Sequence, residues 1–258
     1  MSSEYFRPEE ERFIQRMEEL FLRAEQKNYF QVTSFLNQRE QYILENISHN
    51  YPETDLYFNG GGYKNERQRA IIAPKYYQLE KSDFQIQAIS IRYAEKFNKL
   101  KHSQILGALV NLGIDRNSYG DIITDGHYWQ FFVIDTMSEL VVEQVKRIGS
   151  NSVSLHKINS DQLLLPTDDY ELMNIVSRSF RVDSITASVF NFSRQTGKDL
   201  IANGKVTVNW IKTSKADYFI SINDVISVRG YGRVKINEIY GQTQNSKWKL
   251  SVSAIKKK

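Results

Sequence analysis

Residues 193–210 are SRQTGKDLIANGKVTVNW. The first half has the pattern of a short helix from about 194 to 202, because Ser193 is a good N-cap and Asn203-Gly204 supplies a helix stop. The second half, Lys205 to Trp210, alternates apolar and polar residues, which is typical of a strand. A short helix that leads directly into a strand predicts a small α+β unit.

The charge of the chain is concentrated around this stretch. Residues 181–258 contain 14 Lys and Arg against 5 Asp and Glu, a net charge of +9. Residues 1–180 contain 20 against 25, a net charge of −5. A basic segment attached to an acidic one suggests a module for an anionic partner, usually nucleic acid or a membrane surface; the alternative is a solvated basic face.

The neighbouring sequence completes the C-terminal unit. Arg181-Val182-Asp183 begins another short helix, and we expect further strands at 205–211, 218–220, 225–229 and 234–240. Residues 161–180 contain Pro166 and predict a connector followed by an extended strand.

In the middle of the chain the spacing of apolar residues changes several times between strand and helix patterns. Apolar residues alternate over 84–93, follow helical spacing over about 103–112, and then mark strands at 121–124 and 128–134. A helix after Ser138 and a strand at 152–158 follow. This βαββαβ order predicts a ferredoxin-like, RRM-like domain.

The N-terminal part has two helical patterns, over 8–27 and over 34–48 with Ser34 as N-cap. Gly60-Gly61-Gly62 marks a tight turn and lacks the Gly-Lys-Ser/Thr ending of a nucleotide loop. The predicted fold class is therefore α+β, with a mostly helical region at 1–80, the ferredoxin-like domain at 81–160, a connector at 161–180 and the basic unit at 181–258.

Composition excludes several kinds of chemistry. The chain has no Cys and 4 His, which excludes disulfides, thiol catalysis and local Cys/His metal motifs. No apolar run is long enough for a transmembrane helix, so we expect a soluble, cytoplasmic protein without membrane insertion. No nucleophile–base pair, metal cluster or cofactor loop is evident, so we predict no catalytic residue, no metal and no cofactor.

The basic unit has a physical basis for binding RNA. A helix N-terminus offers unpaired N–H groups to a phosphate, and Arg194 and Lys198, one turn apart, add full charge beside it. Trp210 is able to stack on an unpaired base, although packing is an equal alternative. For Arg181 a structural ion pair with Asp183 is the alternative. The predicted RNA-binding residues are Arg181, Ser193, Arg194, Lys198, Lys205, Asn209, Trp210, Lys212, Arg229 and Arg233.

Two features of the middle domain are candidates for a second RNA-binding site. Lys99, Lys101 and His102 precede a helix N-terminus and form a possible second phosphate seat, although a solvated turn is the favoured alternative. The strand 127–134, HYWQFFVI, has aromatics but lacks the basic-Gly-aromatic opening of the RRM signature. We therefore predict that Tyr128, Trp129, Phe131 and Phe132 are core and interface residues.

The C-terminal unit resembles the S-four RNA-binding domain, named after a small-subunit ribosomal protein. The resemblance depends on Arg181-x-Asp183, Ser193-Arg194, Gly204-x-Val206-x-Val208-Asn209 and Asp224-x-Ile226-x-Val228. It implies a small α+β fold that contacts structured RNA.

A second set of short motifs lies outside the basic unit: Phe35-Leu36, Glu40-Gln41, Gly61-Gly62-Tyr63, Glu66-Arg67-Gln68-Arg69-Ala70, Leu106-Gly107-Ala108-Leu109, Leu112-Gly113-Ile114, Arg116 and Gly120-Asp121-Ile122. With these motifs, nearly the whole chain is similar to the YlmH family of bacterial RNA-binding proteins. The resemblance implies ribosome association, contact with rRNA or tRNA, handling of stalled large subunits and a link to cell-division proteins.

Two other functions remain open. An RNA-modifying enzyme could use the basic unit for targeting, although the chain lacks a methyltransferase-type glycine loop and the synthetase signatures. A cell-division scaffold could use the acidic N-terminal part as its interface. We expect a non-enzymatic RNA-binding protein.

Overall fold

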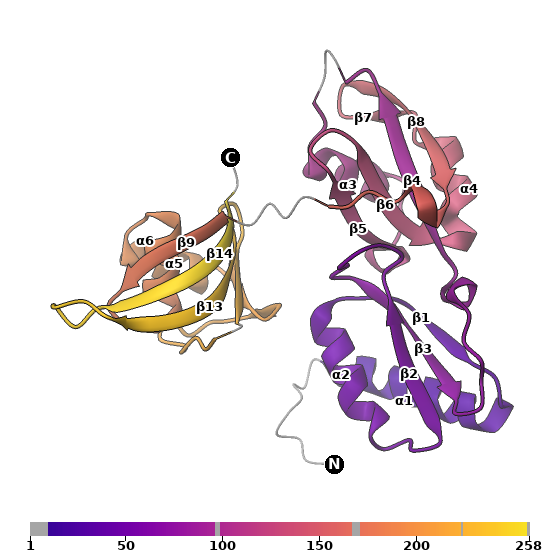
Figure 1. Ribbon diagram of the computed structural model, residues 1–258, viewed down its shortest axis with the longest axis horizontal. Helices are drawn as coiled ribbons and strands as arrows, with labels where there is room; N and C mark the ends of the chain where they lie inside the picture. The colour runs from indigo at the N-terminus through magenta and orange to yellow at the C-terminus, as the bar shows by residue number, and fades with distance from the viewer. Residues whose placement is uncertain (1–9, 96–98, 167–170, 223, 257–258) are drawn as a thin grey trace. The chain divides into compact units, whose positions relative to one another are not determined.

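The computed structural model describes residues 10–95, 99–166, 171–222 and 224–256. The chain divides into two compact units, Met1–Thr167 and Asp168–Lys258 (Figure 1). Helices and antiparallel sheets occur in both, so the predicted α+β class is confirmed. Among the described helices, none is long and apolar enough to cross a membrane.

The first unit begins with two helices on a three-stranded antiparallel sheet of order β1-β3-β2. The sequence predicts a mostly helical region here, and this prediction is wrong, because three strands lie between and after the two helices. The helices bury Phe21 and Ile43 against Ala70 and Ile72 of the sheet. The elements are α1 (Glu11–Lys27), β1 (Gln31–Leu36), α2 (Gln38–Ser48), β2 (Thr54–Asn59) and β3 (Gln68–Pro74).

The start of α2 corrects the expected N-cap at Ser34. Asn37 Oδ1 accepts the Glu40 N–H at 3.0 Å, and the Glu40 carboxylate accepts the Asn37 N–H at 2.7 Å. This capping box fixes the helix start three residues later than predicted. Phe35 and Leu36 are therefore strand residues of β1 and are buried there.

The middle domain has the predicted βαββαβ order, and its sheet order β5-β6-β4-β8 is that of the ferredoxin-like split βαβ, with β7 added at the edge. Helix α4 starts directly after β6, not at Ser138, whose hydroxyl instead donates to the Asp135 carbonyl at 2.6 Å. The elements are the 3-10 helix η2 (Lys81–Phe84), β4 (Ile86–Tyr93), α3 (His102–Asn111), η3 (Arg116–Ser118), β5 (Tyr119–Thr124), β6 (Trp129–Ile134), α4 (Asp135–Gln144), β7 (Arg147–Ile148), β8 (Asn151–Ile158) and η4 (Ser160–Gln162).

The two faces of this sheet are covered differently. Helices α3 and α4 cover one face, where Phe131 is buried. On the other face Phe132 packs against Phe35 of β1. The Gln130 side chain donates to the Gln162 carbonyl at 2.9 Å and accepts the Leu164 N–H at 2.9 Å, which fixes the segment after β8 on that face.

The glycine turn also packs on this face. A Cβ on Gly61 would lie 2.7 Å from both Ile86 and Phe132, and Gly61 has φ +89°. Only glycine fits this approach and conformation, so the predicted tight turn is confirmed and has a packing role.

Arg69 joins the N-terminal sheet to the middle domain. Its side chain is 4% exposed and its guanidinium donates to the carbonyls of Thr33 at 2.7 Å, Phe84 at 2.6 Å and Gln85 at 2.8 Å. Burial lowers the pKa of Arg69 to about 10, so the group is still charged at neutral pH. One carbonyl of β1 and two carbonyls at the end of η2, directly before β4, thus accept hydrogen bonds from the same guanidinium.

Asp121 of β5 makes a second connection between these parts. Its carboxylate accepts the Glu66 N–H at 2.6 Å and the Arg67 N–H at 3.3 Å. The Arg67 guanidinium continues to the Phe35 carbonyl at 2.8 Å and to Asn117 at 3.0 Å. Burial raises the pKa of Asp121, and the nearby Glu66 adds to this rise.

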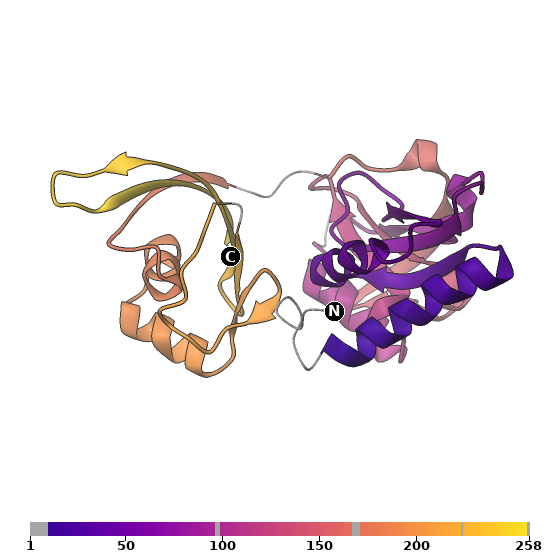
Figure 2. The same ribbon diagram turned by 90° about the horizontal axis from the view of Figure 1, so that it is seen from below.

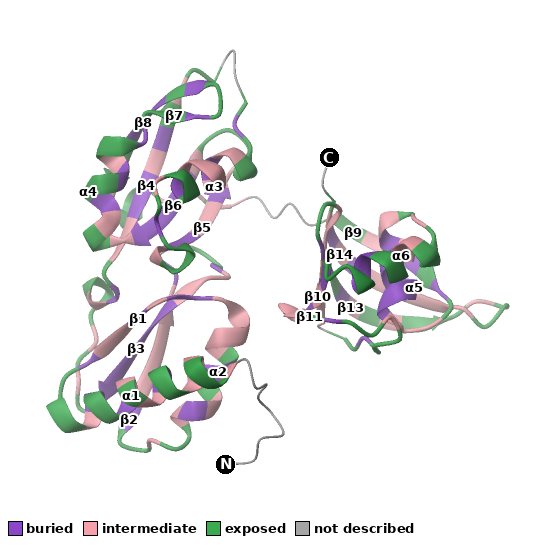
Figure 3. Cartoon of the chain, turned by 180° about the vertical axis from the view of Figure 1, so that it is seen from behind, coloured by how far each residue is buried: buried purple, intermediate pink, exposed green. Residues whose placement is uncertain are grey.

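The second unit is a six-stranded antiparallel sheet of order β11-β10-β12-β13-β14-β9, with both of its helices on one face (Figure 2). Figure 3 shows buried positions along both of these helices. Ile185 and Ile201 of the helices belong to the core that they form with the sheet. The elements are β9 (Glu171–Ser177), α5 (Val182–Phe190), α6 (Arg194–Ala202), β10 (Val206–Val208), β11 (Ile211–Lys212), β12 (Val225–Val228), β13 (Gly232–Gln242) and β14 (Trp248–Lys256).

The extended strand expected after the connector is present as β9, and it pairs with β14, so it belongs to the sheet of this unit. Two other expectations for this unit change. The expected strand at 218–220 is reduced to one bridge between Arg181 and Phe219. Strand β14 was missed, although the alternation of Leu250, Val252 and Ala254 marks its buried side.

Replacing Arg69 with Met should destabilise the protein by about 3 kcal/mol or more, because the buried carbonyls of Thr33 and Phe84 lose this donor, whereas the Gln85 carbonyl keeps the Asp135 N–H. Arg12→Met, at an exposed position of α1, is the matched control and should change stability by about 0.5 kcal/mol or less. Urea unfolding of both variants measures the difference. Equal midpoints would mean that Arg69 does not join the two parts.

Candidate nucleic-acid interface

The helix N-termini of the second unit meet at Asp183. This carboxylate is fully buried and pairs with Arg194 at 2.8 Å and Arg181 at 3.2 Å. The Asp183 N–H donates to the Ala216 carbonyl at 3.3 Å, which holds the following loop to the start of α5. The side chains of Arg181 and Arg194 are still 33% and 45% exposed, so the cluster presents a net positive charge to solvent.

Arg194 has a structural role that the sequence did not predict, and its contact with RNA stays a prediction. Ser193 caps α6, since its hydroxyl accepts the Thr196 N–H at 3.0 Å, and this prediction is confirmed. The capped helix does not leave Arg194 unengaged, because a buried carboxylate requires cationic partners and recruits it. Lys198, one turn later, is exposed as predicted. The predicted ion pair of Arg181 with Asp183 is present.

Asn209 holds a turn. Its side-chain N–H donates to Asp224 at 2.7 Å, and its Oδ1 accepts the Val225 N–H at 2.9 Å. Asn209 and Trp210 both have positive φ values, 47° and 64°, which the asparagine tolerates best. The turn explains why an asparagine stands here; contact of Asn209 or of the half-buried Trp210 with RNA stays a prediction.

The sheet face turned away from the helices carries a row of polar and cationic side chains. Lys212 of β11 pairs with Thr207 of β10, Thr207 with Ser227 of β12, and Ser227 with Arg233 of β13. Arg233 Nε donates to the Ser227 hydroxyl at 3.3 Å. Their neighbours along each strand, such as Val206 and Val228, are buried under the helices, so alternation directs this row outward.

More cations extend this surface. Lys235 lies one outward position beyond Arg233 and is exposed. At the other end, the Arg229 N–H donates to the Lys205 carbonyl at 2.8 Å, so these two exposed residues continue the β10–β12 ladder. We call Lys205, Thr207, Lys212, Ser227, Arg229, Arg233 and Lys235 the outer basic face. Sequence reasoning missed Lys235, although the spacing of two after Arg233 in a strand was a sufficient signal.

The predicted residues thus divide between two faces. Arg181, Arg194 and Lys198 lie on the helix side, where Asp183 engages the arginines. Lys205, Lys212, Arg229 and Arg233 belong to the outer basic face. In the described part of this unit, the outward positions of β10, β11, β12 and of β13 up to Lys235 carry no carboxylate. The outer basic face therefore presents several cations that, unlike the arginines of the helix side, do not surround a buried carboxylate.

The possible second phosphate site, in the middle domain, consists of exposed side chains before a helix. Lys99, Lys101 and His102 are exposed, and α3 starts at His102. The Lys101 N–H donates to the Gln104 side chain at 2.9 Å. Binding of a phosphate here stays a prediction.

The aromatic strand follows expectation at three positions of four. Phe131 and Phe132 are buried on opposite faces of the sheet, and Trp129 packs partly buried against the helical core. Tyr128 is 51% exposed, so it does not belong to the core, and its place in an interface stays a prediction. Among the residues with described positions, no group of His, Asp and Glu is arranged to hold a metal ion.

Comparisons with known proteins agree with this architecture. Residues 80–162 match the family described as "Putative RNA-binding domain in YlmH". The chain is 35% identical over 248 residues to "Ribosome-associated protein quality control protein P2" of Bacillus subtilis (strain 168), covering 96% of each chain. The solved structure "Cell division protein ylmH from Streptococcus pneumoniae" matches 60% of this chain and 93% of its own, with 30% identity and a TM-score of 0.52.

The fold and the matched middle domain define an α+β protein of an RNA-binding class. The chain belongs to the YlmH family.

Charge reversal at Arg194 should destabilise the second unit. Arg194→Glu removes one partner of a fully buried carboxylate and adds a like charge beside it, which should cost about 2 kcal/mol or more. Lys198→Glu makes the same charge change on the same helix at an exposed position and should cost about 0.5 kcal/mol or less. Thermal melts of both variants measure this; equal melting temperatures would show that Asp183 does not depend on Arg194.

Proposed function

We propose that this protein is a non-enzymatic, cytoplasmic RNA-binding factor that acts on structured rRNA or tRNA at the large ribosomal subunit. We propose further that residues 181–258, extended by β9, form an S-four-type RNA-binding domain. The Bacillus subtilis relative is named for ribosome-associated quality control. It is 35% identical to this chain over 96% of the chain's length, which supports proposing a ribosomal role for this protein too.

The outer basic face is the observation that carries the proposal. Lys212, Arg233 and Lys235 lie on strands of one sheet, in which neighbouring strands are about 4.8 Å apart. Between them stand Thr207 and Ser227, whose short hydroxyl side chains let a sugar-phosphate backbone approach closely. The first outward carboxylate on β13 is Glu238, beyond a bulge.

The Asp183 cluster is the second part of the proposed interface. Its two arginines share one carboxylate, so the N-termini of α5 and α6 keep an excess positive charge. Helix N-termini favour phosphate for the same electrostatic reason. In this proposal the cluster orients the RNA and the outer basic face supplies most of the affinity.

A cell-division scaffold is the second candidate, because the Streptococcus pneumoniae structure is named as a cell-division protein. A pull-down before and after nuclease treatment separates the two candidates. Partners that disappear after nuclease support the ribosomal role, and division proteins retained after nuclease support the scaffold.

The double variant Lys212→Glu/Lys235→Glu should weaken binding of a tRNA or an rRNA hairpin by about tenfold or more. Its log–log salt dependence should also become shallower by roughly 0.7–0.9 for each phosphate that the protein no longer neutralises. Lys27→Glu/Lys75→Glu makes the same charge change at exposed positions of the first unit. Titrations across a salt series compare the two; an equal weakening in both would indicate only a net-charge effect and reject the outer basic face.

The non-enzymatic assignment has its own test. Nucleotides of rRNA and tRNA from cells with and without the gene should give the same modification profile by mass spectrometry. A modified nucleotide that disappears on deletion and returns with purified protein would establish an RNA-modifying enzyme instead.

A further inference from the structure

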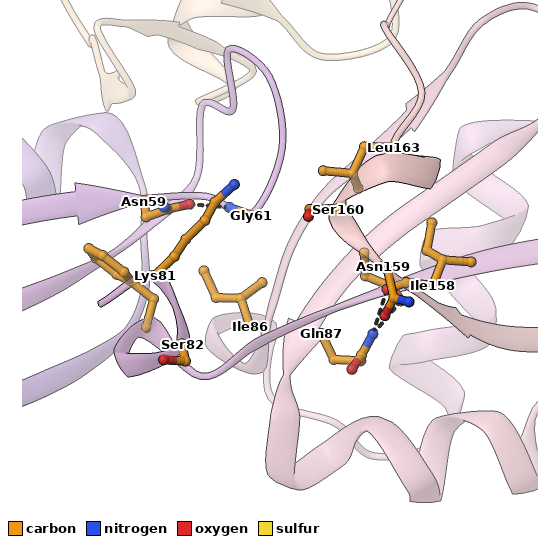
Figure 4. Close-up of a pocket in the computed structure, with 12 residues that line it drawn as sticks. Asn59, Gly61, Lys81, Ser82, Ile86, Gln87, Ile158, Asn159, Ser160 and Leu163 are labelled. Carbon is orange, nitrogen blue, oxygen red and sulfur yellow. Dashed lines mark hydrogen bonds between the residues drawn. The ribbon is translucent and has the colours of Figure 1, made fainter. Parts of the chain in front are cut away.

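A pocket of about 400 Å³ opens on the non-helical face of the middle domain's sheet (Figure 4). Its walls come from the end of β2, from η2, from the start of β4 and from the end of β8 with η4. A volume of this size accommodates one small organic group and is too small for a nucleic-acid duplex. The outer basic face, on the sheet of the second unit, does not include it.

The pocket has an aliphatic floor. Ile86 and Ala88 of β4 line it beside Ile158 of β8 and Leu163. Ala88 is 8% exposed, whereas the other three side chains are only partly buried. A floor of partly exposed aliphatic side chains offers apolar surface to one face of a flat ring.

The rim of the pocket is polar and carries a cation. Asn59, Asn159 and Ser160 supply amide and hydroxyl groups, and Lys81 is exposed, with its side chain extending along the pocket toward Gly61 (Figure 4). None of the described lining residues is a carboxylate. Outside the lining, the Glu80 carboxylate accepts the hydroxyl of Ser82 at 3.3 Å and is the acidic group next to Lys81 in sequence.

A polar strip leads away from the pocket along the same face. The pair Ala88–Ile158 at the pocket is followed by Ser90–His156 and then by Arg92–Ser154. Because side chains alternate along strands, the outward positions of β4 and β8 continue the face of the pocket. Arg92, Ser154 and His156 are exposed, and the described outward residues of these two strands include no carboxylate.

We propose that the pocket binds one unpaired nucleotide of a single-stranded RNA segment that continues along β4 and β8. The base lies on the aliphatic floor, the asparagines and Ser160 meet its edge, and the Lys81 ammonium meets its phosphate. Arg92 contacts the phosphate of a following nucleotide. The proposal rests on the proposed RNA-binding function and adds a second site. The pocket binds unpaired RNA, whereas the outer basic face binds structured RNA.

A peptide with a free C-terminal carboxylate would also suit one cation beside apolar surface. The nucleotide is favoured because most of the lining residues, from Lys81 to Ser160, lie within 80–162, the region that matches an RNA-binding domain. The several amide and hydroxyl groups of the rim also suit the nitrogen and oxygen atoms of a base better than an aliphatic side chain.

Methyl NMR on the full chain tests the proposal. Uridine and adenosine 5′-monophosphates are the first probes, and a single-stranded RNA hexanucleotide is the second. We expect shifts at the methyl groups of Ile86, Ala88, Ile158 and Leu163. Lys81→Glu should weaken binding about tenfold, and Glu80→Gln should strengthen it because it removes a nearby negative charge. Lys75→Glu, at an exposed position after β3, is the matched control and should bind like the wild type.

Each other outcome overturns the proposal. Shifts confined to the second unit would place the nucleotide elsewhere. If inorganic phosphate binds as tightly as the nucleotides, the aliphatic floor does not contact a base. If a short peptide with a free carboxylate displaces the nucleotide, the pocket is a peptide site. Equal binding by Lys81→Glu, with an unperturbed methyl spectrum, would remove the phosphate contact. Structured-RNA binding by the Lys212→Glu/Lys235→Glu variant, measured in parallel, reports separately on the proposed function.

Discussion

The second unit depends on the pairing of buried Asp183 with Arg181 and Arg194. A carboxylate removed from water is stable only with cationic partners or hydrogen bonds, and the starts of the two helices each supply one arginine. The same residue also holds the loop at Ala216 through its N–H. One residue therefore determines how α5, α6 and the following loop meet.

This pairing also bears on the proposed RNA interface. Because the two arginines pair with Asp183, they are only partly available to a phosphate. The cations on the opposite side of the sheet, such as Lys212 and Lys235, have no buried acid to neutralise among the described outward positions of their strands. Cationic side chains of the unit thus also lie on the sheet face that the helices leave uncovered.

In the first unit, contacts between the N-terminal sheet and the middle domain have a comparable effect. Arg69 holds the end of η2, directly before β4, and Phe35 and Gly61 cover part of the sheet face that an RRM-like domain leaves open. What remains uncovered is a pocket and a strip along β4 and β8. The coverage reduces a broad surface to a narrow one, which suits a single strand better than a duplex.

The sequence predicted local features well where a short-range interaction determines them. The Ser193 cap, the Gly61 turn and the βαββαβ order were all predicted from neighbouring residues. Long-range effects were not predictable: the engagement of Arg194 by Asp183 depends on how two helices pack. The predicted start of α2 was wrong for a different reason, because the capping box of Asn37 and Glu40 was overlooked in favour of Ser34.

Binding of RNA by the outer basic face is tested most directly in cells. Crosslinking the protein to RNA in vivo, sequencing the RNA and mapping the modified peptides provides this test. We expect rRNA or tRNA attached to peptides from residues 205–235. Crosslinks mainly to messenger RNA, or attached only to peptides outside the second unit, would contradict this expectation.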